Sequence, residues 1–244
     1  MGISQSLLRT CYRTAWVFSK NGSLAKYNAL KAASKERGIR DGKQDTAASN
    51  IKVIARAGKR MPPLVWIDVE TTGLVVEKDL ILEIAMLITD SDLNQLAPAQ
   101  NIVIGHASEE LKKLNAWSLE WHSRSGLLRE VSTSKVTIKE AEQTLLALIV
   151  KHCPVPNKAI LAGNNVAFDR KFLESYMPIL ANYIHFRNVD VSTLNELAKR
   201  WAPDILRGYS KKHTHRALDD ITESLHELQY YKSSIFSNIE QKDL

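Results

Sequence analysis

Two acidic residues stand two positions apart near residue 70, directly after a run of apolar side chains. Residues 64–67 (LVWI) predict a buried β-strand, and Asp68 and Glu70 follow at its end. Because side chains alternate along a strand, both carboxylates should point to the same face. Neighbouring carboxylates repel each other unless a cation lies between them, and hard oxygen ligands suit Mg²⁺ or Mn²⁺ rather than zinc. Taken alone, the pair could also be a solvated strand end.

Two further segments carry acids that could join this pair. Asp169 follows a short apolar strand predicted over residues 159–162, and His215, Asp219 and Asp220 stand at the start of a long predicted helix. Ordinary alternatives exist: Asp169 could be a helix N-cap, and the two later aspartates could be first-turn acids that favour the helix dipole. His215 and Asp220 are five residues apart, so they can face one cleft with different roles. The combination is more specific than any single segment.

Regular elements must position these segments. The apolar patterns predict strands over residues 64–67, 81–89, 102–105, 159–162 and 183–191, and helices from residue 138 and over residues 169–176, 192–200 and 216–232. A capping box, Thr137 with Glu140, opens the first of these helices. This order of elements predicts an α/β fold, with a mixed sheet flanked by helices. We assign Trp66 and Trp201 to its core.

The net charge of +6 divides unevenly along the 244 residues. Residues 1–60 hold 13 Lys and Arg and three acids, a net charge of +10, whereas the remainder holds 20 basic and 24 acidic residues, a net charge of −4. The folded part therefore offers no global basic surface, and bound cations must supply part of any attraction to phosphodiesters. No apolar run approaches the ~20 residues of a membrane span. Cys11 and Cys153 alone imply no disulfide framework.

The first 35 residues contain no acid and are rich in Arg, Lys, Ser and Ala. On a helix, one face would carry Ile3, Leu7, Cys11, Ala15 and Phe18, and the other Arg9, Arg13 and Lys20. Such a start is typical of a mitochondrial transit peptide; a disordered basic tail or a surface helix is the alternative. Residues 1–35 are thus the predicted transit peptide, 36–60 a flexible linker, 61–236 the folded domain and 237–244 a C-terminal tail.

The three acidic segments resemble the three exonuclease motifs of the DEDDh superfamily of 3′→5′ exonucleases. They are residues 68–74 (DVETTGL), 163–170 (GNNVAFDR) and 215–220 (HRALDD). Longer stretches resemble the oligoribonuclease branch, especially its eukaryotic mitochondrial members: residues 80–85, Trp117, and residues 122–127, 187–193 and 215–224. The similarity covers about residues 64–232. It implies a ribonuclease-H-like α/β fold, a single domain with an N-terminal extension, and a homodimer.

The resemblance implies a catalytic set at these motifs. His215 matches the general base, and the ligands of two divalent cations, Mg²⁺ or Mn²⁺, are matched by Asp68, Glu70, Asp169 and Asp220. The chemistry of these residue types agrees with that assignment. Two cations roughly 3.5–4 Å apart can activate a water and stabilise both the phosphate and the leaving 3′ oxygen. A histidine that titrates near neutrality can accept the proton of the water.

The resemblance also implies contacts to the substrate. Leu74 matches a leucine that wedges against the terminal bases, and Trp117 and His122 match residues near the 3′ nucleotide. Arg187 and Ser192 match residues that hold the far phosphate end of a very short substrate. Trp117 has an ordinary alternative role as a half-buried packing residue.

Several positions depart from the oligoribonuclease pattern. Thr71 stands where Met is usual, Asn165 where Ser is usual, and Ala167-Phe168 where Gly-Gln is usual. Phe186 stands where a Tyr usually contacts substrate bound to the partner subunit. Its ring can still stack on a base, but the hydroxyl is absent. These changes spare the catalytic set and bear instead on the preference for very short RNA.

The resemblance implies an enzyme that degrades short single-stranded RNA to 5′-mononucleotides in the mitochondrial matrix or intermembrane space, without a membrane partner. A form lacking the leader could act in the cytoplasm or nucleus. Two other functions are compatible: a broader DEDDh exonuclease acting on longer RNA or DNA, and an inactive nucleic-acid-binding module. The filled catalytic positions argue against the module, and rates on substrates of increasing length separate the two nucleases.

Overall fold

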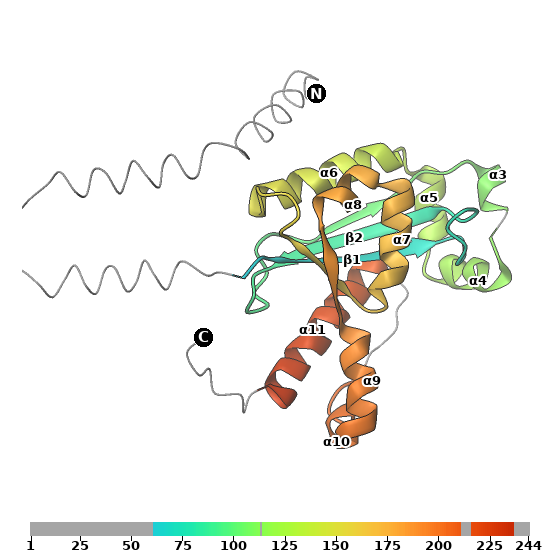
Figure 1. The fold of residues 1–244 in the computed structure, drawn as a ribbon. Helices are drawn as coiled ribbons and strands as arrows, with labels where there is room; N and C mark the ends of the chain where they lie inside the picture. Colours follow the sequence, from blue (N-terminus) through green and yellow to red (C-terminus); the bar gives the residue numbers. More distant parts are fainter. Residues whose placement is uncertain (1–60, 113, 211–215, 237–244) are drawn as a thin grey trace, which may run out of the picture. The chain divides into compact units, whose positions relative to one another are not determined.

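A five-stranded mixed sheet forms the centre of the folded domain. The computed structural model describes residues 61–112, 114–210 and 216–236; the predictions for the transit peptide, linker, His215 and C-terminal tail lie outside them. Across the sheet the order is β3-β2-β1-β4-β5 (Figure 1). The strands are β1 (Leu64–Thr71), β2 (Ile81–Thr89), β3 (Gln100–Val103), β4 (Ile160–Gly163) and β5 (His185–Asp190). Because β1 pairs antiparallel with β2 but parallel with β4, the predicted mixed sheet is confirmed.

Helices flank the sheet, and the longer ones match the predictions. They are α3 (Ser108–Leu111), α4 (Ala116–Arg124), α5 (Leu127–Thr133), α6 (Ile138–His152), α7 (Val166–Tyr176), α8 (Pro178–Tyr183), α9 (Val191–Trp201), α10 (Pro203–Leu206) and α11 (Ala217–Ile235). The capping box that opens α6 is confirmed, since Thr137 and Glu140 exchange side-chain and backbone hydrogen bonds. Within the described residues, no helix is long and apolar enough to cross a membrane.

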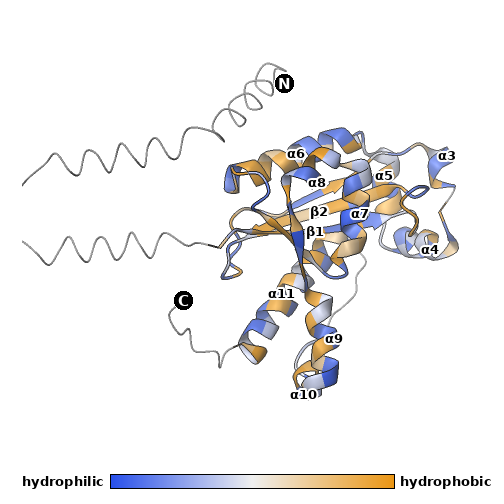
Figure 2. Ribbon diagram, in the orientation of Figure 1, coloured by the Kyte–Doolittle hydropathy of each residue, from blue (hydrophilic) through white to orange (hydrophobic). Residues whose placement is uncertain are grey.

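Alternate side chains of β1 enter separate cores on the two faces of the sheet. Val65 and Ile67 pack with residues of α6, α7 and α8, whereas Trp66 packs with residues of α11. Figure 2 shows the apolar colour concentrated along β1 and β2. Trp66 is fully buried as predicted, and its indole N–H donates to Oγ1 of Thr89 at 3.1 Å. The even-numbered side of β1 therefore faces α11.

The core assignment of Trp201 is wrong. Its side chain is 76% exposed at the last residue of α9. The helix buries Val191 and Ala198 nearer the sheet. The end of α9 and the following α10 project beyond the strands (Figure 1), so an apolar residue there does not reach the core.

The strand predicted over residues 183–191 begins later, at His185, because the preceding residues form α8. Buried Glu142 holds the start of that helix: its Oε1 accepts from the backbone N–H groups of Ile179 and Leu180, at 2.7 and 3.0 Å. This carboxylate satisfies N–H groups that a helix start leaves without intrahelical partners. The third strand also lies two residues earlier than predicted.

Candidate active site

Three carboxylates meet where the end of β1 faces the start of α11. Atoms of Asp68, Glu70 and Asp220 that could bind a metal all lie within 4.8 Å of one another. Asp68 and Glu70 share one face of β1, as the period of two predicts. Asp220 lies in the first turn of α11, and its backbone N–H donates to the carbonyl of Arg216 at 3.0 Å. Residues 150 positions apart in sequence are thereby joined in one acidic group.

Asp169 joins this group from α7. It lies in the first turn of that helix and is only 3% exposed. Its Oδ1 accepts the backbone N–H of Val69, the residue between the two β1 carboxylates, at 3.0 Å. Burial and then the charge of Asp68 raise the pKa of Asp169 well above its usual range. The helix N-cap is Asn165, so the N-cap alternative for Asp169 is wrong.

Glu70 is also largely buried, since its side chain is only 12% exposed. Burial, followed by the charges of Asp68 and Asp220, raises the pKa of Glu70 to about 9. Such a carboxyl ionises at neutral pH only when a positive charge is placed beside it. The group offers oxygen donors, so it fits hard divalent cations such as Mg²⁺ and Mn²⁺.

His122 forms a buried wall of the site rather than an exposed part of it. The residue is 1% exposed, and its Nε2–H donates to the carbonyl of Thr71 at 2.9 Å. Its Nδ1 lies 3.9 Å from Oε2 of Glu70. From the same region, Nδ2 of Asn115 donates to the carbonyl of Thr72 at 3.4 Å. Helix α4 is thus held over the end of β1, with His122 beside a predicted metal ligand.

The loop after β1 presents Leu74 to solvent, where it is 78% exposed. Asp79 holds the loop: its carboxylate accepts from the hydroxyl of Thr72 at 2.9 Å and from the backbone N–H of Val75 at 2.8 Å. A Cβ at Gly73 would lie 2.6 Å from that carboxylate, so the close approach requires glycine. The tip of the loop is therefore fixed from within while Leu74 points outward.

Trp117, in the first turn of α4, is 54% exposed and lies 6.1 Å from the ring of Trp121. The alternative of a half-buried packing residue is compatible with this position, because one part of the indole packs and the rest is accessible. A base could stack on the accessible part.

Asn165 and Ser192 meet at the carboxyl ends of β4 and β5. Asn165 has the left-handed φ of 50°, and its backbone N–H donates to Oδ1 of Asp190 at 3.1 Å. The backbone N–H of Ser192 donates to the same oxygen at 3.0 Å, and its hydroxyl at 2.5 Å. The Ser192 hydroxyl proton is committed to Asp190, so its oxygen remains as an acceptor.

Phe186 and Arg187 lie on β5, an edge strand of the sheet. Phe186 is 77% exposed and stacks on His185 with the ring centroids 4.4 Å apart. The guanidinium of Arg187 lies 5.8 Å from the centre of the Phe186 ring. An exposed aromatic ring and a cation therefore stand side by side at the sheet edge.

Two residues of the site carry a role that sequence reasoning missed. Glu83 is fully buried in β2, and Arg216, at the N-cap of α11, forms an ion pair with it at 2.7 Å. The available signal was a single charge in the otherwise uncharged segment 81–89. A buried carboxylate needs a partner, but the sequence does not show which one. Arg216 stands 133 positions from Glu83 along the chain, so no local pattern links the two residues. His215 directly precedes Arg216 and lies outside the described residues.

The chain is similar in sequence to nucleases of known name. The profile of the family described as Exonuclease (RNase_T) matches residues 65–228. The mitochondrial oligoribonuclease of Homo sapiens is 44% identical over 201 residues, which are 82% of this chain and 81% of the relative. The oligoribonuclease of Haemophilus influenzae (strain PittGG) is 47% identical over 169 residues, 69% of this chain and 92% of the relative.

Solved structures share the fold at low sequence identity. A zinc-bound complex of E. coli exonuclease I with single-stranded DNA matches with a TM-score of 0.57 and 14% identity, over 71% of this chain and 41% of the other. Exonuclease I from Methylocaldum szegediense matches with a TM-score of 0.54 and 15% identity, over the same shares. The chain spans about two fifths of these proteins, and the likeness concerns the fold alone.

The similarity in sequence identifies the protein family, whereas the solved structures show only the fold. The family profile spans more than half of the chain, and the matched range includes the acidic residues that converge at the end of β1. Since oligoribonucleases are also 44–47% identical over most of the folded domain, this chain belongs to the exonuclease family, in its oligoribonuclease branch.

Proposed function

We propose that this protein is a 3′→5′ exoribonuclease that hydrolyses short single-stranded RNA to 5′-mononucleotides. The observation that carries the proposal is the convergence of Asp68, Glu70 and Asp220 within 4.8 Å. It occurs in a chain 44–47% identical to proteins named oligoribonuclease. A broader exonuclease that acts on longer RNA or DNA is the second candidate, favoured by the departures at Asn165 and Phe186.

Four carboxylates would hold two divalent cations, Mg²⁺ or Mn²⁺. Asp68, Glu70 and Asp220 supply the converging oxygens, and Asp169 adds one oxygen beside Asp68 while its other oxygen binds the backbone of β1. When bound, two such cations supply an activated water and stabilise the leaving 3′ oxygen. The repulsion among the ionised carboxylates then becomes attraction toward the metal.

His215 would accept the proton of the attacking water. This role comes from the match to the third motif, where His215 directly precedes Arg216. Arg216 is anchored to Glu83, so one neighbour of the base is fixed in the protein. A neutral imidazole is required for this step, and protonation of His215 in acid would stop it.

Exposed side chains on both sides of the acidic group would hold the RNA. Leu74 and Trp117 offer apolar surface to the terminal bases, and both are more than half exposed. Arg187 would hold the far phosphate, and Ser192, next to Asn165, would join it by turning its hydroxyl proton from Asp190 to the phosphate. His122 would act near the 3′ nucleotide through Glu70 and Thr71, because its own ring is buried.

A homodimer would complete the site at the sheet edge. Phe186 is 77% exposed on β5, and β4 lies between that edge strand and β1, which carries Asp68 and Glu70. Residues on an edge strand are available to a second copy of the chain. In this proposal Phe186 of each subunit stacks on RNA bound to the other.

The protein would act in mitochondria, in the matrix or intermembrane space. The acid-free residues 1–35 support a transit peptide. Relatives from Homo sapiens, Bos taurus and Mus musculus are named mitochondrial oligoribonucleases. A form without the leader would extend the location to the cytoplasm or nucleus.

Removing any one metal ligand should nearly abolish hydrolysis. We expect Asp68→Asn, Glu70→Gln, Asp169→Asn and Asp220→Asn each to lower kcat/KM on an RNA pentamer by more than ~10²-fold, because the ligands act as a unit. His215→Ala should lower it by about 10²–10⁴-fold. EDTA should stop the wild type, and Mg²⁺ or Mn²⁺ should restore it. Normal turnover by Asp169→Asn with unchanged metal dependence would contradict the assignment.

The raised pKa of Glu70 predicts how stability depends on pH without metal. The folded carboxyl keeps its proton up to about pH 9, whereas the unfolded one releases it above its ordinary pKa of 4.5. Unfolding therefore releases a proton in this window, and stability falls as the pH rises. We expect Tm in EDTA to fall from about pH 5.5 to 8, less steeply in Glu70→Gln, and the stabilisation by Mn²⁺ to grow with pH. The exposed variant Glu120→Gln should keep the wild-type slope; a flat wild-type profile would contradict the prediction.

Substrate length should matter, because residues 61–244 have a net charge of −4 and so offer little basic track for a long strand. We expect faster hydrolysis of dimers to pentamers than of strands of about twenty nucleotides at equal concentration. Arg187→Ala should slow the short substrates selectively, because one charge-assisted phosphate contact contributes ~1.5–3 kcal/mol. Equal rates over the whole series, unaltered by Arg187→Ala, would favour the broader exonuclease.

Residues 1–60 should contain the mitochondrial targeting signal. A fluorescent protein fused behind them is expected in mitochondria, and exchanging Arg9 and Arg13 for Glu should keep it out, because import requires a cationic amphipathic face. A matched fusion with Lys at both positions should still enter. Cytosolic fluorescence of the unmodified fusion would reduce this segment to a basic tail.

A further inference from the structure

Strand β2 contains a charge in a place where charge is costly. All nine of its residues are buried, and Glu83 is the single charged residue among them. The Glu83 side chain is 0% exposed. An isolated buried carboxylate costs far more free energy than the neighbouring apolar residues gain, unless it is paired and hydrogen-bonded. The partners of Glu83 therefore indicate what the residue does.

The partners of Glu83 come from two separate elements. Nε of Arg216 donates to both carboxylate oxygens at 3.2 Å, and Nη2 donates to Oε1 at 2.7 Å. The backbone N–H of Ala217 donates to Oε2 at 3.1 Å, and Nδ2 of Asn101 donates to Oε1 at 2.9 Å. Both oxygens are thus fully used. Ala217 is the first residue of α11, so Glu83 binds the start of that helix through both side chain and backbone.

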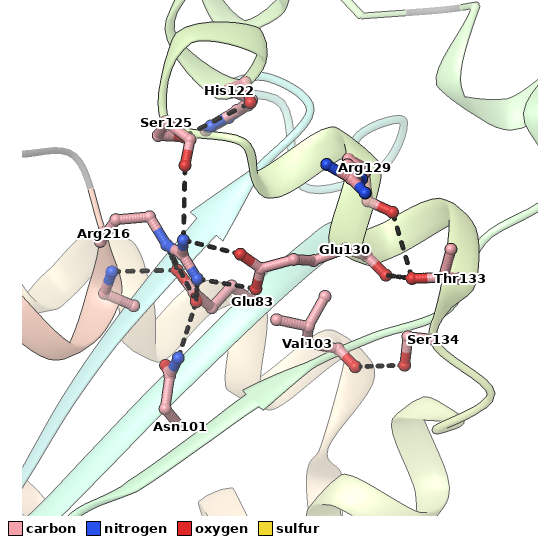
Figure 3. A network of polar contacts seen from close by, with 11 residues as sticks. Glu83, Asn101, Val103, His122, Ser125, Arg129, Glu130, Thr133, Ser134 and Arg216 are labelled. Atoms are coloured by element: carbon pink, nitrogen blue, oxygen red, sulfur yellow. Dashed lines mark hydrogen bonds and ion pairs between the residues drawn. The ribbon is translucent and has the colours of Figure 1, made fainter.

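The guanidinium of Arg216 also reaches a third element. Its Nη1 and Nη2 donate to the carboxylate of Glu130 in α5 at 3.0 and 2.9 Å. Figure 3 shows Arg216 reaching both Glu83 and Glu130 from the start of α11. The hydrogen bond to Glu83 raises the pKa of Arg216, so its positive charge is permanent. One side chain therefore joins α11, β2 and α5.

The ion pair between Glu83 and Arg216 lies beside the acidic group. Glu83 is the direct cross-strand partner of Glu70 in the antiparallel pairing of β1 with β2. Opposed residues of such a pair point to the same face, with Cβ atoms about 4.5–5.5 Å apart. Asp220 follows Ala217 by three residues, within the turn that Glu83 binds. Glu83 is thus adjacent to one predicted ligand on β1 and fixes the helix start that carries another.

Arg216 also compensates the charge of Glu83 beside Glu70. Glu83 lies opposite Glu70 in the strand pairing, and the guanidinium of Arg216 is 2.7 Å from the Glu83 carboxylate. Without Arg216, a further carboxylate would stand unpaired next to an already crowded acidic group. With Arg216, Glu83 has its oxygens occupied and takes no part as a ligand.

We propose that Glu83 and Arg216 form a positioning pair for the divalent cations of the active site. The pair fixes the first turn of α11 so that Asp220 meets Asp68 and Glu70. The positive charge of Arg216 also balances the negative charge of Glu83 beside these ligands. The proposal rests on the proposed function, because it assigns these residues to the metal site of that reaction. Neither residue touches the substrate, and both act through the ligands.

The affinity for Mn²⁺ tests the pair directly. Calorimetric titration of the full chain with Mn²⁺ should show binding weakened by about 10–100-fold in Glu83→Gln and in Arg216→Gln, as for partners that orient metal ligands. Hydrolysis of an RNA pentamer should lose more at limiting than at saturating Mn²⁺. Arg216→Lys should fall between wild type and Arg216→Gln, because it keeps the charge but loses the two-pronged geometry.

The double variant Glu83→Gln with Arg216→Gln separates charge compensation from simple loss of contacts. The factor by which its Mn²⁺ affinity falls should be smaller than the product of the factors for the two single variants. The reason is that the double variant leaves no carboxylate buried without its guanidinium. The matched control is Glu196→Gln, which removes an exposed ion pair to Arg200 on α9 and should keep wild-type Mn²⁺ affinity.

Wild-type Mn²⁺ affinity in folded Glu83→Gln and Arg216→Lys would overturn the positioning role. Should Arg216→Gln lose its circular dichroism signal, Arg216→Lys and the double variant decide the question. The proposed function is judged separately, by hydrolysis in the wild type. A wild-type protein that binds Mn²⁺ but leaves the RNA pentamer intact would refute the function while the binding comparison still judges the pair.

Discussion

Repulsion between carboxylates in a partly buried site is the interaction on which the rest of the structure depends. Asp68, Glu70 and Asp220 approach within 4.8 Å, and burial raises the pKa of Glu70 to about 9. Such a group does not assemble through its own interactions. It is held by the hydrophobic packing around it: β2 is buried throughout, and the cores on the two faces of β1 fix the strand from both sides. The packing stabilises an arrangement whose ionised form bound cations would favour.

The register of β1 against β2 connects packing to chemistry. Glu70 opposes Glu83, and Asp68 opposes Ala85, so the acidic face and the α11-facing core lie on the same side. A slip of one residue would turn Glu70 and Asp68 away from α11. The ladder becomes irregular between Glu70 and Thr71, the last residue of β1, and the chain then enters the loop that carries Leu74. Regular pairing thus extends as far as the proposed metal ligands and ends before the loop that is proposed to contact the substrate.

The sequence predicted most of the long elements and part of the site. Strand β2 was found at its observed ends because its apolar run is unmistakable, and the capping box fixed the start of α6. Short helices such as α3 and α10 were missed, since four residues carry no periodic pattern. Trp201 was misplaced because hydrophobicity does not reveal where a helix passes the end of a sheet. The acidic motifs came from local spacing, whereas the burial of His122 and the pairing of Glu83 depend on tertiary contacts.

The hydrogen bond from the Val69 N–H to Oδ1 of Asp169 fixes the orientation of that carboxylate. Oδ1 accepts this backbone donor, so as a proposed metal ligand Asp169 would use mainly Oδ2. An asparagine of the same shape would turn its carbonyl toward Val69, because two donors cannot face each other. Its amide NH₂ would then occupy the free position and donate to neighbouring acids such as Asp68. In the proposed metal site, an isosteric amide would therefore replace the attraction to a cation by a hydrogen bond. It would stabilise the metal-free protein without supporting hydrolysis.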